Sequence, residues 1–266
     1  MDERTERTET ANEGLPSGLK RLWGTDERAQ RKPRLGLSLE RIVQAAIGLA
    51  DADGLGAVSM SRVAERLGFT TMSLYRYVAG KDELLLLMHD AAWEPPLVLD
   101  IPDDDWRTAL EKWSRELRAS MQRHPWLERI RVTERMGTPS QLTWLDRGLR
   151  ALAATPLGEF EKTQILLLLN GHVFADARVL ADMQDAARES GVPVGEGAAA
   201  YGTAMRALAD AERFPALRRA VDAGAFDPGE ARRFADPDVL FTYGLERILD
   251  GVECAIRRHA GEAAES

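Results

Sequence analysis

The stretch SMSRVAERLGFTTMSLYRY, residues 59–77, decides the predicted fold. Ser59 is a good N-cap for a first short helix, and Gly68 ends that helix. Ala64 is small at the position where this helix would cross the second one. Two short helices joined by a glycine-containing turn are typical of a helix-turn-helix, whose second helix enters the major groove of DNA. Ordinary helical hairpins share this spacing, so spacing alone leaves both interpretations open.

The outward side of the second helix carries side chains that donate hydrogen bonds. Such donors suit phosphates and base edges. They are Thr70, Thr71, Ser73, Arg76 and Tyr77.

Charge is unevenly distributed along the chain. The 266 residues carry a net charge of -8, but residues 1–18 hold -3, residues 19–81 hold +5 and residues 82–266 hold -10. A basic segment attached to an acidic body indicates an anionic partner for that segment, although a solvated basic surface is the alternative. Because the donor-rich helix lies in the basic segment, the combination favours DNA binding over an ordinary hairpin.

Helical patterning continues on both sides of this stretch. Ser38 begins a helix with apolar residues three or four apart, and another helix starts at Lys81. Further helices are predicted over residues 103–123, 125–131, 139–153, 158–189, 197–212, 215–223 and 237–259. No run of alternating β-branched residues predicts a strand. The predicted fold is all-α, with an N-terminal three-helix helix-turn-helix DNA-binding domain and a C-terminal helical domain.

Composition and motifs disfavour several classes of protein. No stretch reaches ~18 consecutive apolar residues, so no membrane span is expected. Residues 1–13 lack the apolar run of a signal peptide, and a single cysteine allows no internal disulfide, so a cytoplasmic protein is expected. No phosphate loop, nucleophile elbow or H-E-x-x-H motif is present, and the four histidines are scattered. We therefore predict no catalytic residues, no metal and no cofactor.

Residues 38–90 resemble the N-terminal domain of the TetR family of transcriptional repressors. The string MSLYRYVAGKDELLLLM, residues 72–88, resembles the subgroup around the tetracycline repressor. The resemblance implies a sequence-specific regulator, a repressor that a small molecule releases from its operator. An activator, and a protein of the same fold that has lost DNA binding, are the alternatives. The matching residues are Ile42, Ala45, Ala46, Leu49, Asp53-Gly54-Leu55, Ser59, Arg62, Ala64, Leu67-Gly68, Ser73-Leu74-Tyr75-Arg76-Tyr77-Val78, Lys81 and Glu83-Leu84.

The resemblance also implies DNA contacts at matching positions. Arg62 matches a position that reaches a base edge or phosphate, and Lys81 would favour a phosphate at the start of its helix. A flexible basic arm, residues 1–37, reaches the minor groove or phosphates in one interpretation and only solubilises the chain in the other. The predicted DNA-binding residues, for a palindromic double-stranded operator, are Arg34, Arg62, Thr70, Thr71, Ser73, Tyr75, Arg76, Tyr77 and Lys81.

The DNA-binding domain is assigned to residues 38–94, and a ligand-binding and dimerisation domain to residues 95–266. Residues 237–259 carry an apolar stripe at helical spacing, and the helix around residues 164–179 is apolar on much of its circumference. The resemblance implies that these two helices form a four-helix bundle in a homodimer, whereas core packing within one chain is the alternative. The predicted interface residues are Leu166, Leu169, Phe241, Leu245, Ile248, Leu249, Val252 and Ile256.

A small-molecule pocket in the second domain is also implied by the resemblance. Aromatic and polar side chains there suit an apolar or aromatic effector. Core packing or a turn position is the alternative for each tryptophan and for His124. Asn170 and His172 interrupt an apolar run, so each needs a polar partner from a ligand, from the other subunit or from the core. The predicted ligand-binding residues are Trp113, His124, Trp126, Trp144, Asn170, His172 and Phe174.

Overall fold

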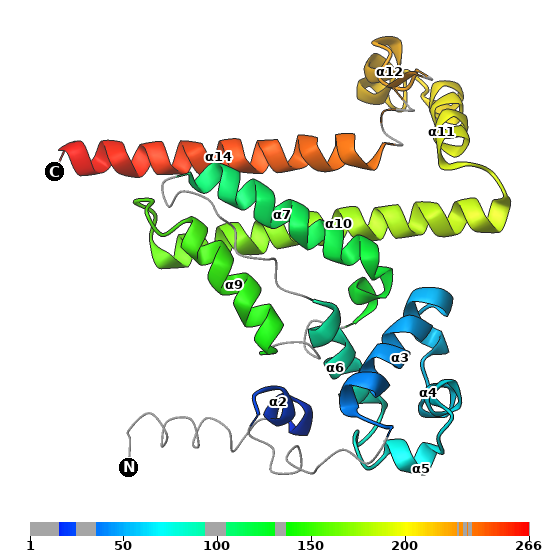
Figure 1. Cartoon of the computed structure of the whole chain (residues 1–266). Coiled ribbons are helices and arrows are strands. Elements are labelled where there is room, and N and C mark those ends of the chain that lie inside the picture. Colours follow the sequence, from blue (N-terminus) through cyan, green and yellow to red (C-terminus); the bar gives the residue numbers. More distant parts are fainter. Residues whose placement is uncertain are drawn as a thin grey trace. The chain divides into compact units, whose positions relative to one another are not determined.

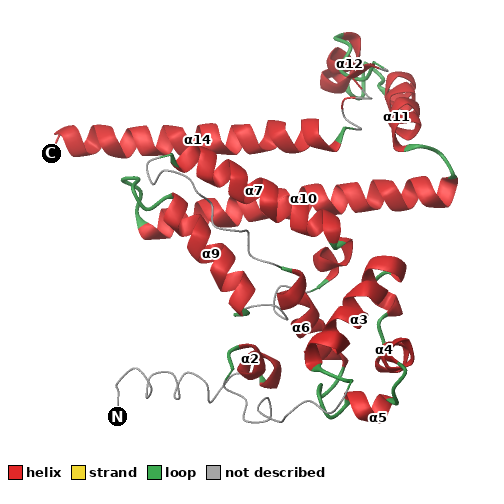
Figure 2. Cartoon of the chain, in the orientation of Figure 1, coloured by secondary structure: helices red, strands yellow, loops and turns green. Residues whose placement is uncertain are grey.

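The fold is all-α, as predicted. The computed structural model describes residues 16–24, 36–93, 105–130, 137–227, 229–230, 233 and 236–265, and every regular element within them is a helix (Figure 2). None of these helices is long and apolar enough to cross a membrane. In chain order they are α2 (Ser17–Leu22), α3 (Leu39–Asp53), η2 (Leu55–Ala57), α4 (Met60–Leu67), α5 (Thr71–Leu74), α6 (Lys81–Ala92), α7 (Trp106–Arg123), η3 (Pro125–Arg129), α9 (Pro139–Ala151), α10 (Glu159–Ser190), α11 (Val194–Leu208), α12 (Pro215–Asp222) and α14 (Pro237–Glu265).

The chain divides into two compact units, residues 1–153 and 154–266. The predicted boundary at residue 94 falls between α6 and α7, outside the described residues. In terms of contacts, α7, η3 and α9 therefore belong to the same unit as α3–α6. The functional assignment of residues 38–94 and 95–266 remains a prediction, because compactness alone does not test it.

Helices α3, α4 and α5 form the three-helix core of the first unit. The hydroxyl of Ser59 accepts from the backbone N–H of Arg62 at 3.2 Å and caps α4, as the sequence indicates. Gly68 ends α4 in the left-handed conformation, with φ of 74°, which a side chain would disfavour. Val63 and Leu74 are fully buried and hold α4 and α5 together, so the opposite side of α5 faces outward.

Helix α2 changes the expectation for the N-terminal arm. Its Leu19 is buried, and a Cβ atom added to Gly18 would lie 2.7 Å from the side chain of Leu86 on α6. Arg21 forms an ion pair of 3.3 Å with the buried Glu83 of α6. This part of the arm is therefore packed rather than flexible, because a short amphipathic turn can bury its apolar side. Arg34 and residues 25–35 lie outside the described residues.

The second unit is built on the two longest helices, α10 and α14, which pack side by side (Figure 1). His172 of α10 lies where α14 has Gly244, and its Nε2 donates to the carbonyl oxygen of Phe241 at 2.9 Å. A Cβ atom on Gly244 would collide with this imidazole ring. Glycine at this position therefore permits the close approach of the two helices.

Candidate nucleic-acid interface and ligand cavity

The outward face of α4, α5 and the turn after α5 carries most of the predicted DNA-binding side chains. Arg62, Thr70, Tyr75 and Arg76 are exposed, whereas Thr71 and Ser73 are half-buried. The α-helical part of α5 ends at Leu74, and a tighter turn continues to Tyr77, so the helix is shorter than the predicted one through Tyr77. The face still presents guanidinium, hydroxyl and phenol groups on one side of the fold.

Two short-range contacts hold this face in place. The guanidinium of Arg62 lies 2.7 Å from a carboxylate oxygen of Asp53, and both side chains are about half exposed. The hydroxyls of Thr70 and Ser73 lie 2.9 Å apart. Exposed pairs of this kind are weak and readily exchange their partner for a phosphate. The contacts therefore orient the donors without withdrawing them from solvent.

Tyr77 differs from the other predicted DNA-binding residues. It is half-buried, its hydroxyl donates to the carbonyl oxygen of Leu37 at 3.1 Å, and its own carbonyl accepts from Arg21. This tyrosine thus has a packing role that the exposed Tyr75 does not share. Lys81, by contrast, is exposed at the first residue of α6, where no side chain of the described residues caps the helix. Its ammonium and the first backbone N–H groups of α6 lie together at that helix end.

Two of the three predicted ligand-binding tryptophans, Trp113 and Trp144, form a cluster with Trp93 in the first unit. Trp113 of α7 donates from Nε1 to the carbonyl oxygen of Trp144 of α9 at 2.9 Å, and both rings are buried. Trp93 lies edge-on to Trp144, with ring centroids 6.2 Å apart. Trp144 Nε1 and the hydroxyl of Ser114 are buried without a hydrogen-bond partner among the described residues. The cluster therefore leaves these two buried polar groups unsatisfied.

His124 and Trp126 meet the helix-turn-helix instead of a pocket. Trp126 Nε1 donates to Oδ1 of Asp51 at 2.7 Å, and Nδ1 of His124 lies 2.8 Å from the same oxygen. Asp51 belongs to α3, the first helix of the helix-turn-helix. No sequence signal pointed to this contact, because the residues lie more than 70 positions apart.

The three predicted ligand-binding residues of α10, Asn170, His172 and Phe174, differ in burial and in hydrogen bonding. His172 stacks on Phe241, with ring centroids 5.2 Å apart, and donates to the same residue's carbonyl oxygen, so its partner comes from the core. Asn170 has a buried Oδ1 without a hydrogen-bond partner among the described residues. Phe174 is half-buried. These three residues lie in the second unit, whereas Trp113, His124, Trp126 and Trp144 lie in the first.

A cavity that sequence reasoning missed lies in the second unit. It has a volume of about 660 Å³ and is lined by the C-terminal part of α10, by α11, by the turn at Ala225-Phe226 and by Leu240. The small residues Gly197, Ala198 and Gly202 leave the space open. Their spacing on one helix was the available signal, but it identifies a cavity only when the facing elements are known.

Comparison with known proteins decides the family. The profile described as "Bacterial regulatory proteins, tetR family" matches residues 42–88, and "Tetracyclin repressor-like, C-terminal domain" matches residues 100–256. The chain belongs to the TetR family. Its relatives include the HTH-type transcriptional repressor DrrR1 of Streptomyces coeruleorubidus, which is 36% identical over 97% of this chain and 93% of that protein. The class A tetracycline repressor from an Escherichia coli transposon is 27% identical over 79% of this chain and 88% of that protein.

Solved TetR-family structures share the fold. ActR of Streptomyces coelicolor in complex with actinorhodin superposes with a TM-score of 0.68 and 28% identity, covering 84% of this chain and 98% of ActR. Apo ActR gives a TM-score of 0.65 at 28% identity and covers 87% of this chain and all of ActR. The predicted function, a DNA-binding transcriptional repressor that responds to a ligand, is thus confirmed at the level of the TetR family, which is a family of regulators rather than enzymes.

Most of the predicted dimer residues of this TetR-family regulator are buried in the single chain. Six of the eight are buried within the chain itself, and the other two, Ile248 and Ile256, are half-buried. This burial favours the alternative of core packing for the six, and the dimer interface itself stays a prediction. The six are Leu166, Leu169, Phe241, Leu245, Leu249 and Val252. A different face of α10 is exposed and apolar, and its large side chains are Phe160, Leu167, Leu168 and Val179.

Proposed function

We propose that this chain binds a palindromic operator as a homodimer in the cytoplasm and is released when an aromatic small molecule binds. The observation that carries the DNA-binding part is the exposed row of donors on α4, α5 and the following turn. Arg62, Thr70 and Arg76 are all exposed, whereas Leu74 of α5 is buried. Guanidinium groups recognise guanine edges and phosphates, and hydroxyls recognise either bases or phosphates.

The N-terminus of α6 is also part of the proposed contact with DNA. Lys81 and the N-terminus of α6 together suit one phosphate, since both contribute positive charge. Tyr75 is about half exposed and can reach the sugar-phosphate backbone, whereas Tyr77 would first have to release Leu37. We therefore assign the phenol contact to Tyr75.

The proposed dimer rests on the exposed apolar face of α10. Phe160, Leu167, Leu168 and Val179 recur at helical spacing along one side, and Gly171 and Ala175 between them are small and exposed. Several large apolar side chains exposed on one side of a helix are typical of an interface between proteins. A dimer would supply the second recognition helix that a palindromic operator requires.

An aromatic effector suits the tryptophan cluster. ActR was solved with actinorhodin, and a related fold supports a bound small molecule here. Trp144 Nε1 and the Ser114 hydroxyl are buried without partners among the described residues, so a ligand that enters between α7 and α9 and offers an acceptor would satisfy them. We therefore propose Trp113 and Trp144 as effector contacts.

Direct contacts would transmit the response within the first unit. Asp51 joins η3 to α3, and Ser140 of α9 donates from its backbone N–H and its hydroxyl to Asp90 of α6, each at 2.9 Å. A ligand that moves α7 or α9 would consequently move α3 and α6. By thermodynamic linkage, an effector that prefers the displaced arrangement weakens DNA binding, and DNA weakens effector binding by the same factor.

The test is binding of the full chain to the DNA upstream of its own gene, measured by fluorescence anisotropy at low salt. The double variant Arg62→Ala/Tyr75→Ala is expected to lose at least 100-fold in affinity and keep its thermal midpoint. Arg219→Ala removes one exposed arginine from α12 of the second unit and serves as the control, with affinity within two-fold of the unaltered chain. Unchanged affinity in the double variant would refute the assignment of the DNA-binding face.

A further inference from the structure

The cavity in the second unit is bounded by the end of α10, by α11, by the turn after α12 and by the start of α14. Met183 and Ala187 of α10 form one wall, and Ala198 of α11 forms the facing one. Its volume of about 660 Å³ lies in the range of sites that bury drug-sized molecules, about 300–1,000 Å³. Tyr201, at the rim, is mostly exposed, so the cavity opens to solvent beside this ring.

The lining of the cavity is apolar and uncharged. Among the described residues, no acidic or basic side chain lines it, and its hydroxyl groups belong to Ser190 and Tyr201. Ser190 is already bonded, since its hydroxyl donates to the carbonyl oxygen of Ala186 and accepts from the backbone N–H of Val192. A charged ligand would therefore lose its hydration without gaining a partner, which is costly. The lining selects for an uncharged molecule.

The far wall is fixed by a helix C-terminal motif. Gly224 follows α12 with φ of 82°, and its N–H donates to the carbonyl oxygen of Val221 at 3.0 Å. The next residue, Ala225, donates to the carbonyl oxygen of Ala220 at 3.0 Å. These two bonds make a Schellman motif. The motif sets the direction in which Ala225 and Phe226 leave α12.

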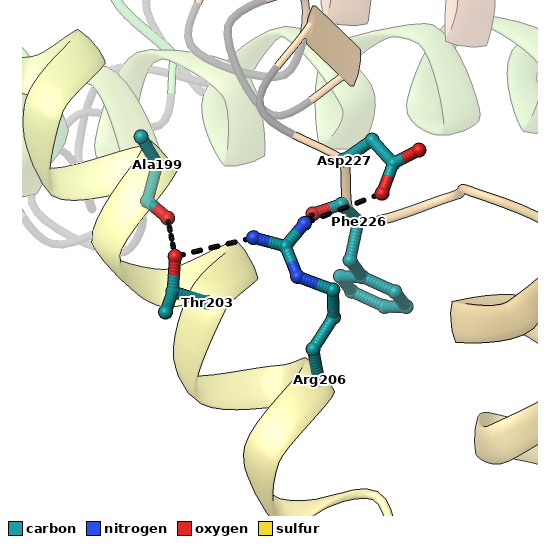
Figure 3. A network of polar contacts seen from close by, with 5 residues as sticks. All are labelled: Ala199, Thr203, Arg206, Phe226 and Asp227. Carbon is teal, nitrogen blue, oxygen red and sulfur yellow. Dashed lines mark hydrogen bonds and ion pairs between the residues drawn. The ribbon is translucent and has the colours of Figure 1, made fainter.

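Arg206 fixes the same wall from the side of α11 (Figure 3). Its guanidinium donates to the carbonyl oxygen of Phe226 at 2.7 Å, to Asp227 at 3.3 Å and to the hydroxyl of Thr203 at 3.3 Å. The turn with Phe226 is thereby bound to α11. Because this wall is already held in place, less conformational entropy of the protein is lost when a ligand binds.

We infer that this cavity binds a planar, uncharged aromatic molecule. The rings of Tyr201 and Phe226 lie 6.4 Å apart at an interplanar angle of 57° and present two aromatic surfaces to one occupant. Small residues on both long walls leave room for a flat ring system. The site goes beyond the effector contacts proposed above, because it lies wholly in the second unit and shares no residue with the tryptophan cluster.

Titration of the full chain with Nile red, a neutral planar dye of four fused rings, tests the site by the rise in dye fluorescence. Ala198→Phe and Ala187→Phe fill the cavity from opposite walls, and each is expected to raise the Kd at least ten-fold. Ala200→Phe is the matched control on an exposed position of α11 outside the cavity, and its Kd should stay within two-fold. Resorufin, a planar anion with a similar ring system, should bind at least ten-fold more weakly than Nile red.

Two further measurements distinguish this cavity from the tryptophan cluster and from a dimer interface. Trp144→Phe should leave the Kd for Nile red unchanged, whereas a loss there would place the dye in the tryptophan cluster and overturn the inference. Thermal melts of the two filling variants verify folding, and unaltered Nile red binding in both folded variants would also overturn it. If the unaltered chain does not bind the dye, and Ala198→Phe alone disrupts the dimer in sedimentation, the cavity is an interface between copies and the inference is wrong.

Discussion

The indole N–H of Trp126 donates to Oδ1 of Asp51 at 2.7 Å, and the same oxygen lies 2.8 Å from Nδ1 of His124. Because a carboxylate only accepts, His124 must carry its proton on Nδ1 in this contact. A single carboxylate oxygen on α3, the first helix of the helix-turn-helix, thus binds two side chains of the turn that follows α7. The link connects the DNA-binding helices to the tryptophan-bearing helices of the same unit.

Asp51→Ala should destabilise the first unit by about 1–3 kcal/mol, because it leaves the buried Trp126 N–H without an acceptor. The thermal midpoint of the full chain measures this effect. Asp53→Ala is the control two positions along α3, since its carboxylate pairs with the half-exposed Arg62 and should cost less than about 1 kcal/mol. Equal losses in the two variants would show that the contact of Asp51 with Trp126 stabilises the unit no more than the exposed ion pair of Asp53 does.

Gly244→Ala should destabilise the second unit by about 1–3 kcal/mol, since the added methyl group would displace the His172 ring from Phe241. Gly251→Ala on the same helix meets no atom of the described residues within 4 Å and should leave stability unchanged or raise it by about 0.5–1 kcal/mol. Denaturant unfolding measures both. A Gly244→Ala chain as stable as the Gly251→Ala chain would contradict the close helix approach.

Substitutions of Tyr75 and Tyr77, in the turn after α5, should separate effects on stability from effects on DNA affinity. Tyr77→Phe removes the bond to the Leu37 carbonyl and should cost about 1 kcal/mol of unfolding free energy. Tyr75→Phe removes an exposed hydroxyl, so stability should hold while operator affinity falls several-fold. The reverse outcome, a stability loss at Tyr75 and a pure affinity loss at Tyr77, would exchange the two roles.

Salt dependence should reveal the phosphate contacts. Each neutralised phosphate contributes about -0.9 to the slope of log K against log salt concentration. If Arg76 contacts a phosphate, Arg76→Ala makes the slope shallower by about 0.9. Met72→Ala, on the exposed side of α5, changes no charge and should leave the slope as it is. A slope unchanged by Arg76→Ala would assign this arginine to a base edge or to no contact.

Leu168→Glu should dissociate the dimer, because it places a charge in the exposed apolar face of α10. Leu145→Glu on α9 is similarly solvent-accessible and should leave the dimer intact. Sedimentation velocity at micromolar concentration distinguishes the two states. A dimer that survives Leu168→Glu would show that the interface lies elsewhere.

The sequence predicted the helices well because their signals are local. Ser59 caps α4, Gly68 ends it, and both act within one helical turn. The sequence could not show which side of α10 and α14 is covered, because Leu166 and Leu168 look alike in an apolar run and differ only in what packs on them. The contact between Asp51 and Trp126 was equally hidden, since it depends on how distant segments meet.

The extent of the first unit has a practical consequence for engineered sensors. A chimera joined near residue 94 would combine α3 with a foreign η3. It would lose the contacts of His124 and Trp126 with Asp51 and the two bonds from Ser140 to Asp90. A join in the loop between α9 and α10, at residues 152–158, would transfer those bonds intact. The segment to exchange between regulators is therefore larger than the helix-turn-helix. Chimeras joined in the loop between α9 and α10 should keep their response to ligand.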